Sequence, residues 1–216
     1  MDSYSIFMEN FDISKNDLFD WGIENTIFPN EKVVEVFWEK LKYRIVNGEK
    51  VYIRGYGRDA HGTELYKGLY EHIFGNINVT KDPTNNAIPQ KNIKNLTKLT
   101  RNKDIYNYQV SHIFGKTKNI FLFEAPWNVC YTPKIMDPFT GHESKGEWPV
   151  EYQDRFIKKA VSLYEKYIVE YNSLLEKYEV KDKTNEYINN LYKVRDNVEV
   201  DQFKNDCKKE VESIAI

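Results

Sequence analysis

The sequence predicts an α+β fold in which a few short strands lie among helices and the last third of the chain is mostly helical. Apolar residues recur at helical spacing over residues 30–46 and 63–74, and the longest such stripe covers residues 151–178. Short β-branched and aromatic runs occur at residues 51–53 and between 105 and 131, where helical spacing is absent. At 216 residues, the chain fits one domain, or one core with a helical appendage.

The first helix is predicted over residues 30–46. Asn30 follows Pro29 and directly precedes the apolar pattern, so its side chain is placed to cap the first turn. Asn47 and Gly48 are typical turn residues, and they end the helix.

A strand is predicted over residues 51–53, followed by a loop at 54–58 with the sequence Arg-Gly-Tyr-Gly-Arg. The second helix covers residues 63–74, and Gly75 is its expected stop. Residues 76–104 are polar and contain two prolines. We expect them to form an extended arm or a long loop, and long loops in compact domains are often functional.

The middle of the chain is expected to contain several strands. Residues 105–110 form a strand candidate that leads to His112, and residues 120–123 and 129–131 are also apolar and strand-like. The pair at 132–133, Thr followed by Pro, is typical of a helix start, and it predicts a short helix there.

The C-terminal third is predicted to be helical. The long helix over residues 151–178 is followed by shorter helices around 184–195 and 200–214. We therefore expect a functional domain over residues 1–150 and a helical region over 151–216, which packs on the core or forms a dimer interface.

Composition excludes several classes of protein. The chain has no apolar run of about 18 residues that could span a membrane, and its acidic N-terminus differs from a secretory signal. The two cysteines, Cys130 and Cys207, are not in a C-x-x-C pair, and we expect them to be reduced thiols in a cytoplasmic protein.

The net charge of −2 conceals a strong asymmetry along the chain. Residues 1–31 contain seven acids and one base, whereas residues 91–118 contain seven bases and one acid. A local excess of positive charge of this size suits contacts with a phosphate backbone. The alternative is a solvated loop in a protein rich in Lys and Asn.

His112 and Asn128 form the pair with the clearest chemical meaning. Hydrolysis of a phosphodiester needs a base that takes a proton from water, a cation that stabilises charge, and a group that orients the base. A histidine with a pKa of about 6.5 can be that base. A hairpin followed by a helix would bring His112, at the end of one strand, next to Asn128, at the start of another.

The segment over residues 106–146 resembles an HNH, or ββα-metal, nuclease motif, with the sequence YNYQVSHIFGKTKNIFLFEAPWNVCYTPKIMDPFTGHESKG. The resemblance covers about 40 of the 216 residues. It implies a ββα-metal core at about 105–146, with His112 as the general base. It also implies that Asn128 orients the base or binds the metal.

The resemblance leaves the later metal ligand open between Asp137 and His142. Either residue would complete a site for Mg²⁺, Mn²⁺ or another divalent cation. The segment departs from the family pattern at Ser111, where an acidic metal ligand often precedes the base. It also lacks the paired cysteines that hold structural zinc in many members.

A second nuclease pattern competes for the same segment. Glu143-Ser144-Lys145 matches the second half of a PD-(D/E)xK motif, and Asp137 is a possible upstream acid. That chemistry requires both acids and the lysine on adjoining strands. The turn residues between Asp137 and Glu143 argue against this arrangement.

The resemblance therefore implies a DNA endonuclease similar to a type II restriction enzyme, which acts on double-stranded DNA as a homodimer. The expected DNA contacts are Arg54, Arg58, Arg101, Lys116 and Lys118. The alternatives are a nucleic-acid-binding protein without catalysis, and a scaffold that assembles through its long helix.

Overall fold

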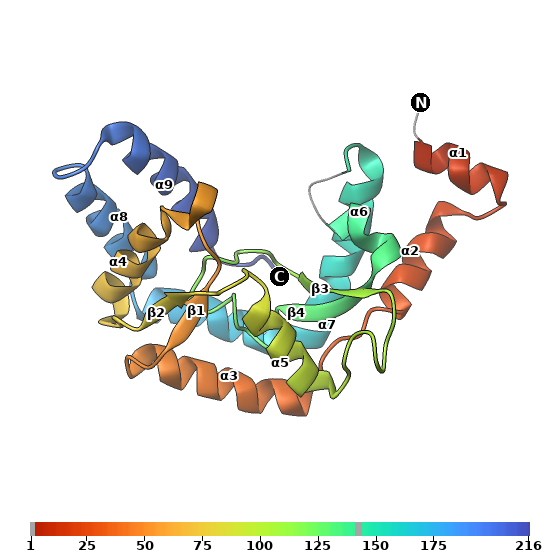
Figure 1. Ribbon diagram of the computed structural model, residues 1–216, viewed down its shortest axis with the longest axis horizontal. Coiled ribbons are helices and arrows are strands. Elements are labelled where there is room, and N and C mark those ends of the chain that lie inside the picture. The colour runs from red at the N-terminus through yellow and green to blue at the C-terminus, as the bar shows by residue number, and fades with distance from the viewer. Residues whose placement is uncertain (1–2, 141–143) are drawn as a thin grey trace.

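The computed structural model describes residues 3–140 and 144–216, and Figure 1 shows helices surrounding two small sheets in this part of the chain. One sheet is parallel and the other antiparallel, and each has two strands. The predicted α+β fold is therefore confirmed. A continuous cluster of buried apolar side chains extends from Met8 to Ile214, so the N-terminal and C-terminal parts share one core.

The N-terminal helices are α1 (Ser3–Asn10), α2 (Lys15–Glu24) and α3 (Glu31–Val46). The predicted cap of α3 is confirmed, because the side chain of Asn30 accepts a hydrogen bond from the backbone N–H of Lys32 at 3.0 Å. One face of α3 is buried against the core, as its apolar pattern predicts. That face consists of Val34, Trp38, Leu41 and Ile45.

The parallel sheet is formed by β1 (Val51–Ile53) and β2 (Val79–Lys81). The chain connects them through the short 3₁₀ helix η1 (Arg58–Ala60) and the helix α4 (Thr63–Phe74). Gly75 ends α4 with a φ of 67°, a left-handed conformation that glycine adopts without a steric penalty. The predictions for β1 and α4 are confirmed.

The prediction of an extended arm over residues 76–104 is wrong, because this segment contains β2 and the helix α5 (Ala87–Thr97). The buried carboxylate of Asp82 accepts hydrogen bonds from three backbone N–H groups, two in the first turn of α5 and one in the turn before it. These donors belong to Thr84, Ala87 and Ile88, at 2.9, 3.0 and 2.7 Å. Pro89 lies in the first turn of α5, where a helix tolerates proline because no intrahelical N–H bond is lost.

The antiparallel sheet is a hairpin of β3 (Tyr108–His112) and β4 (Val129–Pro133). His112 pairs with Val129 at the end nearest the connecting loop, and Tyr108 pairs with Pro133 at the opposite end. The predicted strand at 120–123 is wrong. Those residues form turns in the loop, and they are buried there without joining a sheet.

The predicted helix start at 132–133 is also wrong, because Thr132 and Pro133 complete β4. The helical turns begin just afterwards, as η2 (Lys134–Met136) and α6 (Asp137–Thr140). The strand register keeps Thr132 opposite Gln109, and this pairing overrides the local capping tendency of a Thr-Pro pair.

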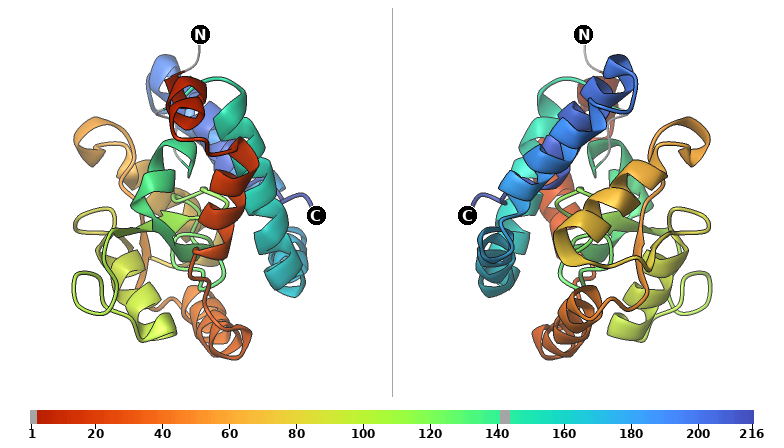
Figure 2. Two further views of the ribbon diagram at one scale, coloured as in Figure 1. Left: turned by 90° about the vertical axis from the view of Figure 1, so that its right-hand side faces the viewer. Right: turned by 90° about the vertical axis from the view of Figure 1, so that its left-hand side faces the viewer.

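The two faces of the hairpin pack against different helices. Tyr108, Val110, Val129 and Tyr131 form a cluster with the buried side of α5. The opposite face, which carries Cys130, belongs to the main core. Figure 2 shows the hairpin between α5 on one side and the long C-terminal helix on the other.

That long helix is α7 (Glu147–Lys177), and it is followed by α8 (Val180–Leu191) and α9 (Asn197–Glu210). The predicted apolar stripe of α7 is buried inside the chain, so it is not available as a dimer interface. Its buried members include Tyr152, Phe156, Ala160, Tyr164, Tyr167, Ile168 and Tyr171. At Tyr164 the backbone leaves helical geometry, with φ −129° and ψ 16°, and α7 is kinked there.

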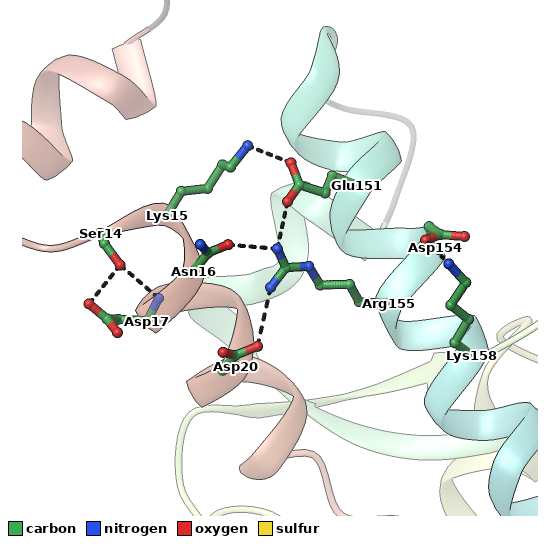
Figure 3. Close-up of polar contacts among 9 residues, drawn as sticks. All are labelled: Ser14, Lys15, Asn16, Asp17, Asp20, Glu151, Asp154, Arg155 and Lys158. Atoms are coloured by element: carbon green, nitrogen blue, oxygen red, sulfur yellow. Dashed lines mark hydrogen bonds and ion pairs between the residues drawn. The ribbon is translucent and has the colours of Figure 1, made fainter.

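A polar network joins α2 to the first turns of α7 (Figure 3). The guanidinium of Arg155 bonds Asp20 at 3.2 Å, Asn16 at 2.6 Å and Glu151 at 2.7 Å. Lys15 forms an ion pair with the same Glu151. The network fixes α2 along α7, at the end of the molecule opposite α8 and α9. Within the described ranges, no helix is both long enough and apolar enough to cross a membrane.

Candidate active site

His112 lies at the end of β3, where the hairpin enters its connecting loop. Its Nε2 atom is 3.1 Å from the carbonyl oxygen of Phe123, and the two rings stack with centroids 5.5 Å apart. A carbonyl oxygen only accepts hydrogen bonds, so Nε2 carries the proton of the neutral ring. The lone pair therefore lies on Nδ1, and no hydrogen bond from the described residues occupies it.

The electrostatic environment keeps the imidazole neutral. Burial of the ring lowers the pKa of His112 to about 4, although the residue as a whole is partly exposed. The hydrogen bond to Phe123 and the charge of Asp82 raise this pKa, whereas the positive charge of Arg54 lowers it. At neutral pH, the ring is therefore a hydrogen-bonded base with a free lone pair.

Arg54 and Asp82, whose charges act on His112, both follow strands of the parallel sheet. Each residue directly follows a strand, so both lie at the carboxyl edge of that sheet. The backbone N–H of Arg54 donates to the carbonyl of Thr117 in the hairpin loop at 3.0 Å. The N–H of Asp82 donates to Ile53 at 2.9 Å. These bonds join three segments that are distant in sequence into one site.

Asp82 was missed by the sequence analysis because residues 76–104 were interpreted as an arm. The available signal was Val79 and Thr80, a short β-branched pair, followed by Asp82-Pro83 and by apolar residues at helical spacing from Ile88. The carboxylate of Asp82 is fully buried, and it is satisfied by the amides of α5. It therefore positions α5 beside His112.

The structure corrects the role expected of Asn128. Its Nδ2 donates to the carbonyls of Leu122 at 2.9 Å and Gly115 at 3.2 Å. Its Oδ1 accepts from the N–H of Phe114 at 2.8 Å. The side chain is completely buried, so its amide is committed to the loop and is not a metal ligand. Asn128 orients the base indirectly, because it fixes the loop that contains Phe123.

The structure also corrects the assignment of Asp137 to the metal site. Asp137 accepts a hydrogen bond of 2.5 Å from Nε2 of Gln109, near the opposite end of the hairpin. Gln109 and His112 are three residues apart on β3, so they point to opposite faces and are separated by roughly 10 Å along the strand. Asp137 therefore does not face the imidazole. His142, the alternative ligand, lies outside the described residues.

The described residues do not by themselves form a site for a divalent cation. Across residues 3–140 and 144–216, no group of three or more His, Cys, Asp and Glu side chains could hold a metal ion. Asp82 and Asn128 carry side-chain oxygen atoms that could bind a metal. These oxygen atoms already accept hydrogen bonds from backbone amides.

The residues of the PD-(D/E)xK interpretation are only partly described. Asp137 begins the short helix α6, whereas that motif requires its acid on a strand. Lys145 is exposed just before α7. Glu143 lies outside the described residues.

Two of the five predicted DNA contacts are occupied by other interactions. Lys118 forms an ion pair of 3.1 Å with Glu210, and its backbone N–H donates to the same carboxylate at 3.0 Å. The ammonium of Lys116 donates to the carbonyl of Lys209, and burial lowers its pKa. In the structure, these two lysines tie the hairpin loop to α9.

The three predicted arginines occupy different surroundings. Arg54 and Arg58 are exposed on the loop after β1, and Arg54 is close enough to affect the charge of His112. Arg101 is partly exposed beyond the end of α5, where it forms an isolated bridge with Ile105. Of the predicted DNA contacts, Arg54 is therefore the one whose charge acts on the imidazole of His112.

Comparison with known proteins identifies the family of the chain. A family described as "Uncharacterised protein PM1201" matches residues 29–216. A protein of Pasteurella multocida (strain Pm70), named "Uncharacterized protein PM1201", is 42% identical over 178 residues, which cover 82% of this chain and 80% of the relative. No solved structure matches the chain significantly. Since the family match includes β1 to α9 and every residue of the site, this chain belongs to the PM1201 family.

Proposed function

We propose that this protein hydrolyses phosphodiester bonds of double-stranded DNA, with His112 as the general base that activates water. The observation that supports the proposal is the hydrogen bond from Nε2 of His112 to the carbonyl of Phe123. It fixes both the orientation and the tautomer of the ring, and it leaves Nδ1 to take a proton. The sequence resemblance to HNH nucleases assigns the same role to this residue.

The lowered pKa has two consequences for a base. At neutral pH nearly every molecule has the ring in the required neutral form, but a pKa of about 4 makes it a modest proton acceptor. A phosphate bound beside the ring adds negative charge, and this charge raises the pKa of the imidazole. Substrate binding would therefore strengthen the base at the moment when it is used.

Arg54 is the second group in the proposed reaction. Its guanidinium is exposed, and the backbone of Arg54 is bonded to the hairpin loop that follows His112, so we expect one phosphate to contact both groups. A guanidinium binds phosphate through two parallel N–H···O bonds. Negative charge accumulates on the phosphate oxygens during attack by water, and a fixed positive charge stabilises it.

The test is cleavage of a supercoiled plasmid in the presence of Mg²⁺ or Mn²⁺. His112→Ala and His112→Gln are expected to reduce the cleavage rate at least about 100-fold, since general-base catalysis contributes roughly 10²- to 10⁴-fold. Arg54→Ala should also slow cleavage, and Arg54→Lys should restore part of the rate. The matched control is His72→Gln, since His72 lies on α4 beside Glu186. A folded His112→Ala protein that cuts at the wild-type rate would refute the proposal.

The cation is a separate prediction, which rests on the resemblance. The resemblance to HNH nucleases predicts that EDTA stops cleavage and that added Mg²⁺ restores it. Circular dichroism should show that EDTA leaves the fold unchanged. Cleavage that continues in EDTA would remove the cation and leave His112 and Arg54 as the reacting groups. The similarity to restriction enzymes, the homodimer and the cytoplasmic location are further predictions of the same kind.

A second candidate is a nucleic-acid-binding protein without catalysis. The exposed lysines of α5 favour it, because they suit phosphate contacts whether or not His112 acts as a base. Retention of labelled DNA by the protein, together with an intact plasmid under every cation condition, would support this candidate over the nuclease.

A further inference from the structure

The outer face of α5 carries a row of lysines. Lys91 and Lys94 are exposed at positions i and i+3 on one side of the helix, and Lys98 is exposed at the C-cap that directly follows Thr97. Pro89, Ile93 and Leu96 are buried on the other side, and the latter two pack on the hairpin. The lysines therefore face solvent because the opposite side of α5 is fixed to the core.

These three ammonium groups form no ion pair with a carboxylate of the described residues. No Asp or Glu occurs from residue 83 to residue 103. Of the ion pairs formed within residues 3–140 and 144–216, none includes Lys91, Lys94 or Lys98. The row thus presents uncompensated positive charge, which a polyanion can neutralise.

The dimensions of the row suit duplex DNA. From Lys91 to Lys98 the helix rises roughly 10 Å, at about 1.5 Å per residue. Double-stranded DNA presents one negative charge for about every 1.7 Å of its axis, so this length faces about six phosphate charges. Lysines on a rigid helix and at its C-cap can follow such a backbone without ordering a flexible loop.

The row is connected to the candidate active site. α5 begins at the carboxylate of Asp82, whose charge also acts on His112. The body of α5 packs on the residues of β3 and β4 that share a face with the imidazole. A backbone lying on the lysines therefore runs along the outer side of the helix that covers the His112 face of the hairpin.

We infer that Lys91 and Lys94 on α5, together with Lys98 at its C-cap, form a binding track for the phosphate backbone of duplex DNA on the helix that covers the His112 face of the hairpin. The inference rests on the proposed function for the identity of the polyanion. Binding and cleavage are nevertheless separate measurements, so each can fail without the other.

The experiment measures binding in a His112→Ala background, so that cleavage does not consume the probe. The probe is a fluorescent duplex of about 25 base pairs, and its anisotropy gives the affinity at several salt concentrations. The test variant carries Lys91→Gln, Lys94→Gln and Lys98→Gln. The matched control carries Lys158→Gln, Lys159→Gln and Lys177→Gln, which remove the same charge from exposed positions of α7. Glutamine keeps the helix propensity of lysine, and thermal melting checks the fold of both variants.

The test variant is expected to bind roughly 10- to 100-fold more weakly at 0.1 M salt, and the slope of log K against log salt should decrease by about 2 to 3. The control should stay within about twofold of its parent. An unchanged slope in the test variant, an equal loss in the control, or a parent that does not bind the duplex would overturn the inference. An equal effect with single-stranded RNA would also overturn the assignment to duplex DNA.

Cleavage assays separate this inference from the proposed function. If the plasmid stays intact but the salt slope falls only in the α5 variant, the track is supported and the nuclease is not. If the protein cuts DNA and the α5 variant binds with an unchanged slope, the nuclease is supported and the track is refuted.

Discussion

At the end of the hairpin, two successive carbonyls accept hydrogen bonds from two residues that the sequence analysis had paired. Leu122 accepts from Asn128, and Phe123 accepts from His112. Asn128 makes three bonds and is completely buried, whereas the imidazole makes one bond and keeps a free nitrogen. The two residues therefore act together, but Asn128 builds the loop and His112 is the reactive group.

Replacing His112 by Gln is expected to reduce the loss of stability in acid. The pKa of the folded imidazole is about 4, below the ordinary value of about 6.5 in an unfolded chain. Between these values the unfolded chain binds a proton that the folded chain does not, so the free energy of unfolding falls as the pH falls. The His112 contribution is up to about 3 kcal/mol over this window.

Urea unfolding at pH 7 and pH 4.5 tests this expectation. The wild type should lose more stability between the two conditions than His112→Gln does. His72→Gln is the control, and it should behave as the wild type. Parallel losses in the wild type and in His112→Gln would show that the ring is not held in its neutral form.

Asn128→Ala is expected to lower the free energy of unfolding by about 2 to 4 kcal/mol. The change removes three hydrogen bonds and leaves buried backbone groups of Leu122 and Phe114 without a partner. Asn189→Ala, at an exposed position of α8, should change stability by less than about 0.5 kcal/mol. Urea denaturation measures both, and a stable Asn128→Ala protein would contradict the structural role.

At the scale of elements, α5 depends on a single side chain outside it. Asp82 binds two N–H groups of the first turn of α5 and the N–H of Thr84 in the preceding turn. The carboxylate also opposes the positive end of the helix dipole. The element that carries the lysine row is thus held at its N-terminus by the parallel sheet and along its side by the hairpin.

Asp82→Asn is expected to destabilise the protein by about 2 to 3 kcal/mol, because the new NH₂ group faces backbone donors instead of accepting from them. Hydrogen exchange of residues 83–90 should accelerate more than that of α3. Asp104→Asn is the control, since Asp104 is exposed and accepts one backbone bond, from Thr100 at 2.8 Å. Equal exchange in the two variants would argue against this anchoring.

Local sequence signals predicted the elements that follow local rules. Asn30 before α3, Gly75 after α4 and the stripe of α7 each act within a few turns of their own helix. The wrong predictions concern segments whose local structure is determined by contacts with residues distant in sequence. Residues 120–123 are apolar because they fill the core from a loop, and Asn119 holds that loop by accepting from the N–H groups of Phe121 and Leu122.

In the candidate site, too, local sequence predicted individual residues but not the contacts between distant segments. His112 was predicted from its place at a strand end, and Arg54 from the glycine-rich loop around it. Their proximity depends on contacts between two separate sheets, such as the bond from Arg54 to Thr117, and sequence spacing does not contain this information. Asp137 was predicted as a metal ligand because its interval from Asn128 fits the family pattern. In the structure, β4 lies between the two residues, and Asp137 bonds Gln109 near the opposite end of the hairpin.

At the scale of the whole molecule, the buried stripe of α7 changes where a dimer interface is expected. Exposed aromatic side chains on the first two helices and the turn between them remain available: Phe7 is 51% exposed, Phe11 is 63% exposed and Trp21 is 45% exposed. The rings of Phe7 and Phe11 are in contact and tilted by 46° to each other, with centroids 4.8 Å apart.

Light scattering after gel filtration is expected to give the mass of two chains, because cleavage of both DNA strands by one site per chain requires a pair. Phe7→Ser combined with Phe11→Ser should shift the protein towards one chain, while Ile77→Ser, at a residue that is 73% exposed, should not. A single-chain mass at micromolar concentration for the wild type would contradict the predicted homodimer.

The bonds between the hairpin loop and α9 have a consequence for the order of synthesis. Lys116 contacts a backbone carbonyl 93 positions later, and Lys118 pairs with Glu210, 92 positions later. While the ribosome adds those intervening residues, the nascent loop lacks the helix that secures it. The imidazole is therefore expected to gain its fixed orientation late, so that a partly made chain would already contain the reactive histidine but not yet its activity.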